Sequence, residues 1–422
     1  MSNDTQPEIR FPGFTDDWEQ RKLKEFGKST GGTSIESEFV EGGKYKVISI
    51  GSYSEQSVYT DQNIRAELTD KTRNRVLNKG DLTMILNDKT ASGNIIGRVL
   101  LIDSNDSYVY NQRTERIEPD HKKYDSQFLY HMLNAPMIRS KIIKQAQGNT
   151  QIYVNWSAIG ELDYLVPNLD EQREIGAFFF NLNNLITLHQ RKLDLLKETK
   201  KGFLQKMFPK NGAKVPEIRF PGFTEDWEQR KLGETKTYFT DGNYGESYPS
   251  SKDMSDKENG VPFLRGSDFS NGYLDSSNAN YIKYEKHQEL TSGHIKQDDI
   301  VIAVRGSLGT LGYANKENEG WNINSQLAIL RTNKSEILGM FLIQYLLSNK
   351  GQKEILSRNT GTALKQLPIK QLKDIPIPMP AISEQQKIGT FFKQLDDTIT
   401  LHQRKLDLLK ETKKGFLQKM FV

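Results

Sequence analysis

Apolar and polar positions alternate in distinct patterns along this chain of 422 residues. Short runs rich in Val, Ile and Tyr, separated by Gly, Asn and Asp, predict β-strands over 45–53, 81–87, 94–103 and 108–118. Apolar residues at helical spacing then predict a helix over 126–146, which Pro136 splits or kinks. Because the strands come mainly before the helix, we expect an α+β domain.

The same order of elements returns in the second half of the chain. Strand patterns cover 261–267, 298–306 and 326–332, and a helical pattern follows over 340–356. Phe341 corresponds to Phe128 at an offset of 213 residues (341 − 128). We therefore expect two domains of similar architecture, although their sequences share little identity.

A much longer helical pattern follows each of these regions. The first has a seam at 182, 185, 189, 193, 196, 200, 203 and 207, whose members step by three or four residues, as in a coiled coil. It contains Leu182, Leu185, His189, Leu193, Leu196 and Phe203. Asp170 is the expected N-cap, and a helix from there to Phe208 would be about 55 Å long. One narrow apolar stripe cannot stabilise so long a helix alone, so the helix needs a partner.

A partner is present in the chain, because the helix is repeated. Residues 186–208 recur letter for letter at 399–421, an offset of 213 (399 − 186). Residues 383–386, Ser-Glu-Gln-Gln, have the spacing of a capping box and predict that the second helix starts at Ser383. Its seam contains Leu395, His402, Leu406, Leu409 and Phe416. We expect the two helices to pair antiparallel as a coiled coil, with a pseudo-twofold axis relating the two domains.

The beginnings of the two units are repeated as well. The sequence PEIRFPGFT at 7–15 recurs at 216–224, an offset of 209 (216 − 7), and WEQRKL follows both copies. In the first copy Phe11, Phe14 and Trp18 are expected to anchor an arm on the domain. The same frame around two different inserts indicates a tandem duplication that performs one task on two targets. The predicted divisions are two domains, 1–166 and 211–378, and two long helices, within 167–210 and 379–422.

Composition narrows the class of protein only a little. The chain has no cysteine, which excludes disulfides and thiolate chemistry, and its net charge of +4 merely permits nucleic-acid binding. The N-terminal sequence lacks the apolar core of a signal peptide, and no apolar run is long enough for a membrane span. We expect a soluble, cytoplasmic protein with no membrane partner.

The motifs of reaction chemistry are missing from the sequence. It contains no Walker loop, no H-E-x-x-H, no G-x-S-x-G and no N/D-P-P-Y/F motif, and its six histidines do not pair at metal-ligand spacing. The glycine-rich segments 93–97 and 306–312 are predicted to be turns, because neither opens a helix. His189 and His402 are interpreted as packing or interhelical polar residues. No catalytic and no metal site is therefore expected, and the chain is interpreted as a binder or a scaffold.

The sequences at the ends of the units carry a resemblance to a known family. They are PNLDEQREI at 167–175, PAISEQQKI at 380–388, PGFTDDWEQRKL and PGFTEDWEQRKL before the variable regions, and GTALKQL at 361–367. With the duplicated layout, they resemble the specificity subunit of a type I restriction-modification enzyme. The first unit departs from this pattern, since GNTQIY at 148–153 matches the last motif only loosely.

This resemblance implies a function and a set of partners. Each variable region would be a target recognition domain that reads one half of a bipartite, asymmetric site in double-stranded DNA. The paired helices would set the gap between the halves and dock two modification (methyltransferase) subunits, and restriction subunits would join through them. S-adenosylmethionine, ATP and Mg would belong to those partners, and this chain would hold no cofactor.

Base edges are read by guanidinium, amide and hydroxyl groups on exposed loops, and Lys and Arg contact phosphates. In the first domain the candidates are Arg73, Arg98, Arg113, Asn149, Gln151 and Tyr153, with Arg65, Arg75 and Lys89 in a wider set. In the second they are Arg265, Arg305, Ser307, Asn324, Arg358, Thr362, Lys365 and Gln366, with Asn322 and Gln326 in the wider set. The polar loops around 148–155 and 358–366 are the preferred candidates. Lysines of the long helices, such as Lys192 and Lys197, are interpreted as a solvated face.

Two other interpretations remain open from the sequence. The chain could be a scaffold whose coiled coil recruits proteins through two adaptor domains, without nucleic acid. It could also be a self-contained methyltransferase or nuclease, but this would need a cofactor motif that the sequence lacks.

Overall fold

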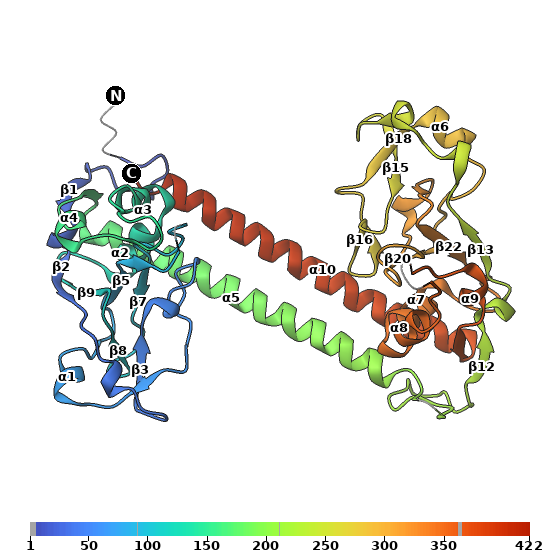
Figure 1. Cartoon of the computed structure of the whole chain (residues 1–422), viewed down its shortest axis with the longest axis horizontal. Coiled ribbons are helices and arrows are strands. Elements are labelled where there is room, and N and C mark those ends of the chain that lie inside the picture. The colour runs from blue at the N-terminus through green and yellow to red at the C-terminus, as the bar shows by residue number, and fades with distance from the viewer. Residues whose placement is uncertain (1–5, 91, 211, 362–364) are drawn as a thin grey trace. The chain divides into compact units, whose positions relative to one another are not determined.

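Figure 1 shows the computed structural model, which describes residues 6–90, 92–210, 212–361 and 365–422. The chain forms two compact units, Met1–Gln190 with Arg404–Val422 (unit 1) and Arg191–Gln403 (unit 2). The division falls within two helices of 38 residues each, α5 (Leu169–Lys206) and α10 (Ile382–Lys419). Each unit therefore contains the beginning of one long helix and the end of the other.

Among the described residues, unit 1 contains two small sheets, two short strand pairs and four α-helices before α5. The first sheet has the antiparallel order β2 (Gly27–Gly31), β9 (Thr114–Pro119), β5 (Leu82–Ile85), β7 (Val99–Leu101). The second has the order β4 (Arg65–Ala66), β3 (Tyr45–Ile48), β8 (Tyr108–Tyr110). Short strand pairs join β1 (Glu19–Lys22) to β11 (Asp163–Val166) and β6 (Asn87–Asp88) to β10 (Ile152–Tyr153). The helices before α5 are α1 (Asp70–Arg73), α2 (Ser126–Asn134), α3 (Pro136–Ile143) and α4 (Trp156–Ile159).

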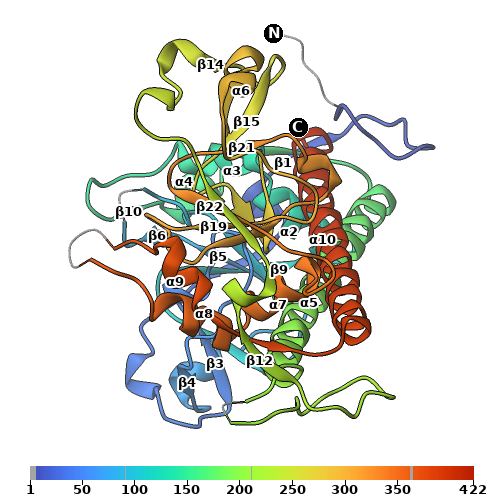
Figure 2. The ribbon, with the colours of Figure 1, turned by 90° about the vertical axis from the view of Figure 1, so that its right-hand side faces the viewer.

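Unit 2 has a larger sheet on a similar plan. Its six strands run in the order β13 (Tyr238–Asp241), β22 (Leu327–Arg331), β19 (Ile300–Ala303), β20 (Leu311–Tyr313), β17 (Tyr273–Leu274), β16 (Phe269–Ser270). A second sheet has the order β14 (Met254–Ser255), β18 (Asn280–Lys283), β15 (Gly260–Leu264), β21 (Asn322–Ile323), and β12 (Glu228–Lys231) pairs with β23 (Pro376–Met379). The helices before α10 are α6 (Tyr284–Glu289), α7 (Gly339–Leu347), α8 (Asn349–Leu356) and α9 (Ile369–Lys373). Strands β14 and β15 lie beside α6 at one extremity of this unit (Figure 2).

Each of the two helical patterns at 126–146 and 340–356 corresponds to two consecutive helices, α2 and α3 in unit 1 and α7 and α8 in unit 2. Pro136 is the first residue of α3, as expected for a residue without an N–H to donate, so the predicted split is confirmed. The prediction of one continuous helix over 340–356 was wrong, because α7 ends before Ser348 and α8 begins after it. The Ser348 hydroxyl accepts a hydrogen bond from Gly351 N at 3.1 Å, which caps α8 locally.

The predicted starts of the two long helices need correction. Glu171 N donates to Asn168 Oδ1 at 3.0 Å, so Asn168 and not Asp170 supplies the cap of α5. Helix α10 begins at Ile382, one residue before Ser383. The capping box is not formed, because Ser383 lies inside the first turn of α10 and not at the N-cap. The Gln386 amide donates to Thr390 Oγ1 at 3.1 Å.

A buried ion pair joins each N-terminal arm to the start of a long helix. Arg10 Nε and Nη2 both lie 2.7 Å from the carboxylate oxygens of Glu171, whose side chain is 0% exposed. In unit 2 Arg219 contacts Glu384 in the same way, at 2.7 and 2.8 Å. Bidentate pairs of this kind fix orientation as well as distance. They explain why an arginine in each arm accompanies a glutamate four residues after Pro167 or Pro380.

The following glutamine joins the same helix start to the domain before it. Gln172 Oε1 accepts from Asp125 N at 3.0 Å, and its amide donates to Pro167 O at 2.9 Å. Gln385 makes equivalent bonds to Leu338 N at 2.9 Å and Pro380 O at 3.0 Å. The Glu-Gln pair therefore sets how each long helix leaves the domain before it.

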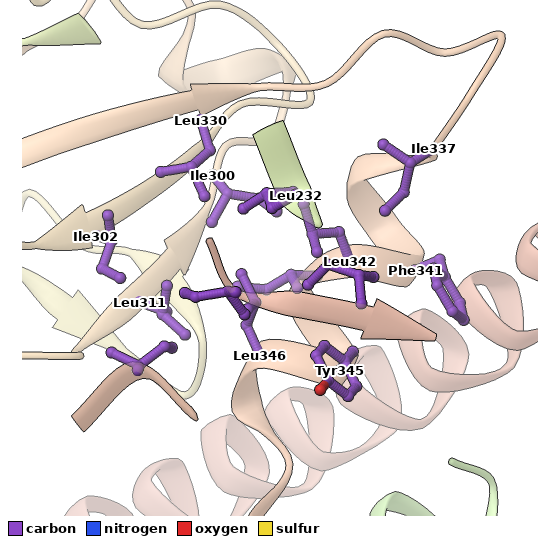
Figure 3. Close-up of a cluster of buried hydrophobic side chains, with 14 of the residues drawn as sticks. Leu232, Ile300, Ile302, Leu311, Leu330, Ile337, Phe341, Leu342, Tyr345 and Leu346 are labelled. Carbon is purple, nitrogen blue, oxygen red and sulfur yellow. The ribbon is translucent and has the colours of Figure 1, made fainter. Parts of the chain in front are cut away.

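The last residues of each long helix belong to a hydrophobic core. Met420 and Phe421 pack in the core of unit 1, where the Phe421 ring lies 5.8 Å from both Phe128 and Phe179. Their copies Met207 and Phe208 pack in the core of unit 2. Figure 3 shows that core, in which apolar side chains of β19, β20, β22 and α7 converge. The repeated Met-Phe thus completes each unit from the C-terminal end of a long helix.

The arm is anchored largely as expected. Trp18 is buried and lies edge-on to Phe128 at 6.1 Å, while Phe11 packs against Phe178 at 5.7 Å. Phe14 is half-buried. The WEQRKL repeat supplies the buried Trp, the four residues of β1 or β12, and the buried Leu23 or Leu232.

Breaking one ion pair should destabilise one unit. Glu171→Ala would leave Arg10 half-buried without its carboxylate, which should cost about 3–5 kcal/mol in the free energy of unfolding of unit 1. Arg173→Ala, which removes an exposed pair with Asp170 at 3.2 Å, is the control and should cost less than about 1 kcal/mol. Equal losses in chemical denaturation would contradict the role given to this pair.

Glu115 on β9 should make the stability of unit 1 depend on pH. Burial raises the pKa of this carboxyl from 4.5 to about 7, against the opposing charge of Arg75. Between these values the folded state binds more protons than the unfolded chain, so stability should fall as pH rises from 4.5 to 7. Glu115→Gln should remove this slope and stabilise the protein at pH 8, whereas Glu67→Gln, at an exposed site, should not. Thermal unfolding of the two variants across this pH range measures how their stability depends on pH. If the stability of Glu115→Gln depends on pH as that of the wild type does, Glu115 is not the titrating group.

Candidate functional site

Each unit carries an exposed hairpin just before its long helix. In unit 1 Gln147 and Tyr153 exchange two backbone hydrogen bonds, each of 2.9 Å. In unit 2 Thr360 and Gln366 do the same, at 2.8 and 2.9 Å, and both positions are displaced by 213 residues (360 − 147 and 366 − 153). The two loops favoured by the sequence are therefore closed by the same bonds.

A glycine begins the turn of each hairpin. Gly148 has a φ of 97°, and a Cβ there would lie 2.2 Å from Gln151 O. Gly361 has a φ of 89°. Side chains other than hydrogen are strained at such φ values, so the glycine is required by the backbone and not by a ligand.

The backbone around the hairpins is also equivalent in the two units. Leu86 N donates to Arg113 O and Leu86 O accepts from Val154 N, both at 2.9 Å. In unit 2 Val304 N donates to Gln326 O at 2.8 Å and Val304 O accepts from Leu367 N at 2.9 Å. Asn87 then pairs with Tyr153 as Arg305 pairs with Gln366. The backbone bonds thus make Arg113 equivalent to Gln326 and Asn87 equivalent to Arg305.

We call these side chains the hairpin surface of each unit. In unit 1 it consists of Asn87, Arg113, Asn149, Gln151 and Tyr153, all exposed except the half-buried Asn87. In unit 2 it consists of Arg305, Gln326, Lys365 and Gln366, all exposed. The Arg305 guanidinium lies over the Tyr244 ring, 5.2 Å from its centre, and donates to Ser325 O at 3.3 Å, which holds it at the base of the hairpin.

The hairpin surfaces offer different chemistry on one backbone frame. Arginine, glutamine and asparagine side chains can form paired hydrogen bonds with the edges of guanine and adenine, and lysine suits phosphates. An arginine stands in unit 1 where unit 2 has a glutamine, and an asparagine stands where unit 2 has an arginine. Such exchanges alter what is recognised without altering the fold.

Eight sequence candidates meet on these surfaces, and the others lie elsewhere. The eight are Arg113, Asn149, Gln151, Tyr153, Arg305, Lys365 and Gln366, with Gln326 from the wider set. Arg73 is exposed at the end of α1, 3.5 Å from the Asp70 carboxylate. Arg98 is half-buried and lines a cavity against α10, where burial lowers the pKa of its guanidinium. Lys89 is exposed beside β6.

Several candidates in unit 2 are engaged within the domain. Arg265 donates to Asn278 O at 2.6 Å, and Arg358 donates to Glu354 O at 2.7 Å. Asn324 is 4% exposed, and its Oδ1 accepts from Gln326 N at 2.9 Å, so it shapes the turn that presents Gln326. Ser307 is exposed in the turn after Arg305, and Thr362 lies outside the described residues. In the wider set, Arg65 pairs with Asp61, Arg75 donates to Tyr110 Oη, and Asn322 is buried.

Sequence reasoning missed Asn87 and Tyr244. Asn87 ends a predicted strand, and only the pairing of β6 with β10 brings it to Tyr153. Tyr244 stands in the turn-rich sequence DGNYGES, where an aromatic residue among polar ones was the available signal. Both are placed by contacts distant in sequence.

The seam of the long helices faces inward at most positions. Leu182, His189, Leu193 and Leu406 are buried, and Leu196, Phe203, Leu395, His402, Leu409 and Phe416 are half-buried. Leu185 is 38% exposed. The most exposed large apolar side chains of the two helices are instead a leucine set outside the seam, Leu188, Leu195, Leu401 and Leu408, which are 62–67% exposed.

Other predicted features are also accounted for. Residues 93–97 lead into β7 and residues 306–310 into β20, so the predicted turns are confirmed there and neither segment opens a helix. Residues 311 and 312, which were included in the predicted turn, belong to β20. Lys192 and Lys197 are exposed, as a solvated face requires. Within the described residues no group of three or more His, Cys, Asp or Glu side chains could hold a metal ion. No described helix is both long enough and apolar enough to cross a membrane.

Comparisons with known proteins agree with this architecture. The type I restriction modification DNA specificity domain matches the chain twice, over residues 15–198 and 224–411. A candidate MjaX type I restriction enzyme specificity subunit of Methanocaldococcus jannaschii is 28% identical, over 76% of this chain and 73% of that protein. The MjaVIII specificity subunit of the same organism is 22% identical, over 81% and 78%. The crystal structure of the S subunit of a type I restriction-modification system from M. genitalium has a TM-score of 0.66 at 17% identity and covers 99% of both chains.

Proposed function

Because the chain belongs to the type I restriction modification DNA specificity family, we propose that it directs such a complex to a bipartite site in double-stranded DNA. Each unit would read one half of an asymmetric site through its hairpin surface. The observation that carries this proposal is the equivalence of the two hairpin frames, with different polar side chains at matching positions. A frame that keeps its backbone bonds while its side chains change suits the reading of two different sequences.

Electrostatics support a division of labour on each surface. Arg113 in unit 1, and Arg305 and Lys365 in unit 2, provide exposed cations beside amide side chains. Cations hold the phosphate backbone without sequence preference, and the amides and guanidinium groups then distinguish bases. Tyr153 would contact a sugar or a thymine methyl through its exposed ring.

The paired long helices would set the gap between the two half-sites. Phe178 and Phe416 lie 5.0 Å apart in unit 1, and Phe203 and Phe391 lie 5.0 Å apart in unit 2. Lys200 contacts Asp396 at 2.6 Å. From Phe178 to Phe203 on α5 the contacting residues on α10 run backwards, from Phe416 to Phe391, as in an antiparallel pair. These contacts support an antiparallel coiled coil with pseudo-twofold symmetry, whose length would act as the spacer.

The exposed leucine set would dock the modification subunits. Leu188 and Leu195 are seven residues apart on α5, and their copies Leu401 and Leu408 have the same spacing on α10. Residues seven apart share a helix face, and exposed apolar residues on one face are typical of a protein contact. Since the set occurs twice, it would bind two copies of one partner.

Catalysis would reside in the partners. Methyl transfer to adenine N6 would use S-adenosylmethionine held by the modification subunits, and ATP and Mg would serve the restriction subunits. This chain would contribute recognition and assembly in the cytoplasm. None of its residues is proposed to act on a reacting atom.

Exchange of one domain should change one half-site. Replacing residues 24–166 with the corresponding domain of a relative should alter one half of the methylated sequence and leave the other half and the gap unchanged. The measurement is a map of N6-methyladenine on DNA from cells that express the chain with its modification subunit. A change in both halves would contradict separate reading. Assembly without new methylation would favour a protein scaffold.

Replacing an exposed leucine should weaken assembly without unfolding the protein. Leu188→Ser with Leu408→Ser should reduce affinity for the modification subunit by about tenfold or more, as for a central interface contact. Lys192→Ser with Lys405→Ser, at exposed positions of the same helices, is the control. Isothermal calorimetry gives both affinities, and equal binding by the leucine variant would place docking elsewhere.

A further inference from the structure

A basic cavity lies in unit 1 between the recognition domain and the end of α10. Its volume is about 230 Å³, and its lining includes Arg98, Lys410, Lys413 and Lys414. None of the described residues that line it is acidic. His131 of α2 forms part of its wall. The cavity is separate from the hairpin surface, whose residues do not line it.

The repeated helix forms a second cavity in unit 2 with a different charge balance. There Lys197, Lys200 and Lys201, the copies of Lys410, Lys413 and Lys414, line a cavity of about 400 Å³ together with Asp396. Lys200 Nζ lies 2.6 Å from Asp396 Oδ1, and both side chains are largely buried. In unit 2 a carboxylate of the chain itself neutralises the inner lysine.

Unit 1 has no such carboxylate at the matching position. The offset of 213 residues places Asn183 where unit 2 has Asp396 (396 − 213) and His131 where unit 2 has Gln344 (344 − 213). Gln344 Nε2 lies 3.4 Å from Asp396 Oδ2, so this position faces the carboxylate in unit 2. Lys413 therefore stands in the environment of Lys200 without the counter-charge.

His131 and Lys413 of unit 1 are the two buried groups that are affected by the missing carboxylate. His131 is 3% exposed, and its Nε2 has no hydrogen-bond partner among the described residues. Burial, and then the Lys413 charge, lower the pKa of His131 to about 3, so its ring is neutral at pH 7 and can donate one hydrogen bond. Burial also lowers the pKa of Lys413. An anion in the cavity would supply both groups with a partner.

We propose that this cavity binds a phosphate group, which takes the place that Asp396 holds in unit 2. Arg98 and the three lysines would supply the charge, and His131 would supply a buried donor. The volume of the cavity is smaller than the roughly 300–1,000 Å³ of sites for larger organic ligands, so the cavity suits a single phosphate better than a nucleotide.

The neighbouring carboxylates do not replace such a ligand. Glu411 lies 3.9 Å from Lys414 at the exposed rim, and its copy Glu198 lies at the same distance from Lys201. Glu55 accepts a hydrogen bond from Asn94 and raises the pKa of Arg98 against the effect of burial. Neither forms an ion pair with Lys413.

Titration of the full chain with inorganic phosphate tests the site. Phosphate should raise the melting temperature of the wild type above that in chloride of equal ionic strength. Lys410→Gln with Lys414→Gln should weaken phosphate binding by about tenfold or more, because charge-assisted hydrogen bonds are lost. The control is Lys197→Gln with Lys201→Gln, the same substitutions in the other copy, which should bind phosphate like the wild type. Phosphate affinity that is unaltered in the first variant, or equally weakened in both, would overturn the proposal.

A second variant supplies the missing carboxylate. Asn183→Asp reproduces the residue of unit 2 and should abolish phosphate binding. The protein should melt in chloride at or above the wild-type temperature, because Lys413 gains a counter-charge. A folded Asn183→Asp protein that binds phosphate normally would also overturn the proposal.

The phosphate could come from solution or from the DNA backbone. The DNA alternative rests on the proposed function, whereas phosphate titration does not. If the ligand is a backbone phosphate, the Lys410→Gln, Lys414→Gln variant in complex with its modification subunits should lower the slope of log affinity against log salt by about 1 or more. Its control should keep the wild-type slope. If the variant loses phosphate binding but keeps the wild-type salt slope, the ligand is a free phosphate. If the wild type and both variants all fail to bind DNA, the proposed function is refuted, whereas the phosphate site is not affected by that result.

Discussion

The buried ion pair between an arm arginine and a helix glutamate is the constraint on which each unit depends. Arg10 and Glu171, like Arg219 and Glu384, lie far apart in sequence and meet with two short hydrogen bonds. A bidentate pair fixes the direction of the helix and not only its position. Because the next residue, Gln172 or Gln385, binds the start of α2 or α7, the arm, the domain and the long helix are oriented together at one point. The position of the hairpin surface depends on the same point, because the hairpin lies in sequence between α2 and α5 in unit 1 and between α7 and α10 in unit 2.

The division between constant frame and variable surface has a physical basis. Backbone bonds such as Gln147 to Tyr153 and Thr360 to Gln366 do not depend on side-chain identity, so they survive when the side chains differ. The glycines at 148 and 361 are the exceptions, because a Cβ at Gly148 would collide with the hairpin backbone. A protein built in this way can change its ligand by substitution at a few exposed positions. The core, which includes Trp18 and Phe421, is unaffected by such changes.

Much of the architecture could be predicted from the sequence because its signals are local or repeated. The seam of α5, the split at Pro136 and the turns at 93–97 follow from spacing and from residue chemistry within a few positions. Predictions failed where residues close in sequence compete for one role and the fold decides between them. Asn168 caps α5 although Asp170 looked equally suitable, and Asn324 is buried although Gln326, two residues further on, is exposed. Among the site candidates, charge alone did not separate Arg305, which reaches the hairpin surface, from Arg358, which binds Glu354. For Arg358 the sequence did contain a local signal, because Glu354 stands four residues before it, a spacing at which side chains of a helix meet.

The repeated helix also shows that the environment of a side chain depends on residues outside its own segment. Residues 186–208 and 399–421 are identical, yet Lys200 is neutralised by Asp396 whereas Lys413 faces His131 in a cavity without an acid. The difference arises outside the repeat, at the pair of positions occupied by Asn183 and Asp396. Removing a charge from one of two equivalent environments leaves the same lysine to seek a counter-ion from solvent or from a ligand, since an unpaired buried charge is costly. Duplication therefore supplied two equal frames, and single substitutions around them were sufficient to give the two units different electrostatic properties.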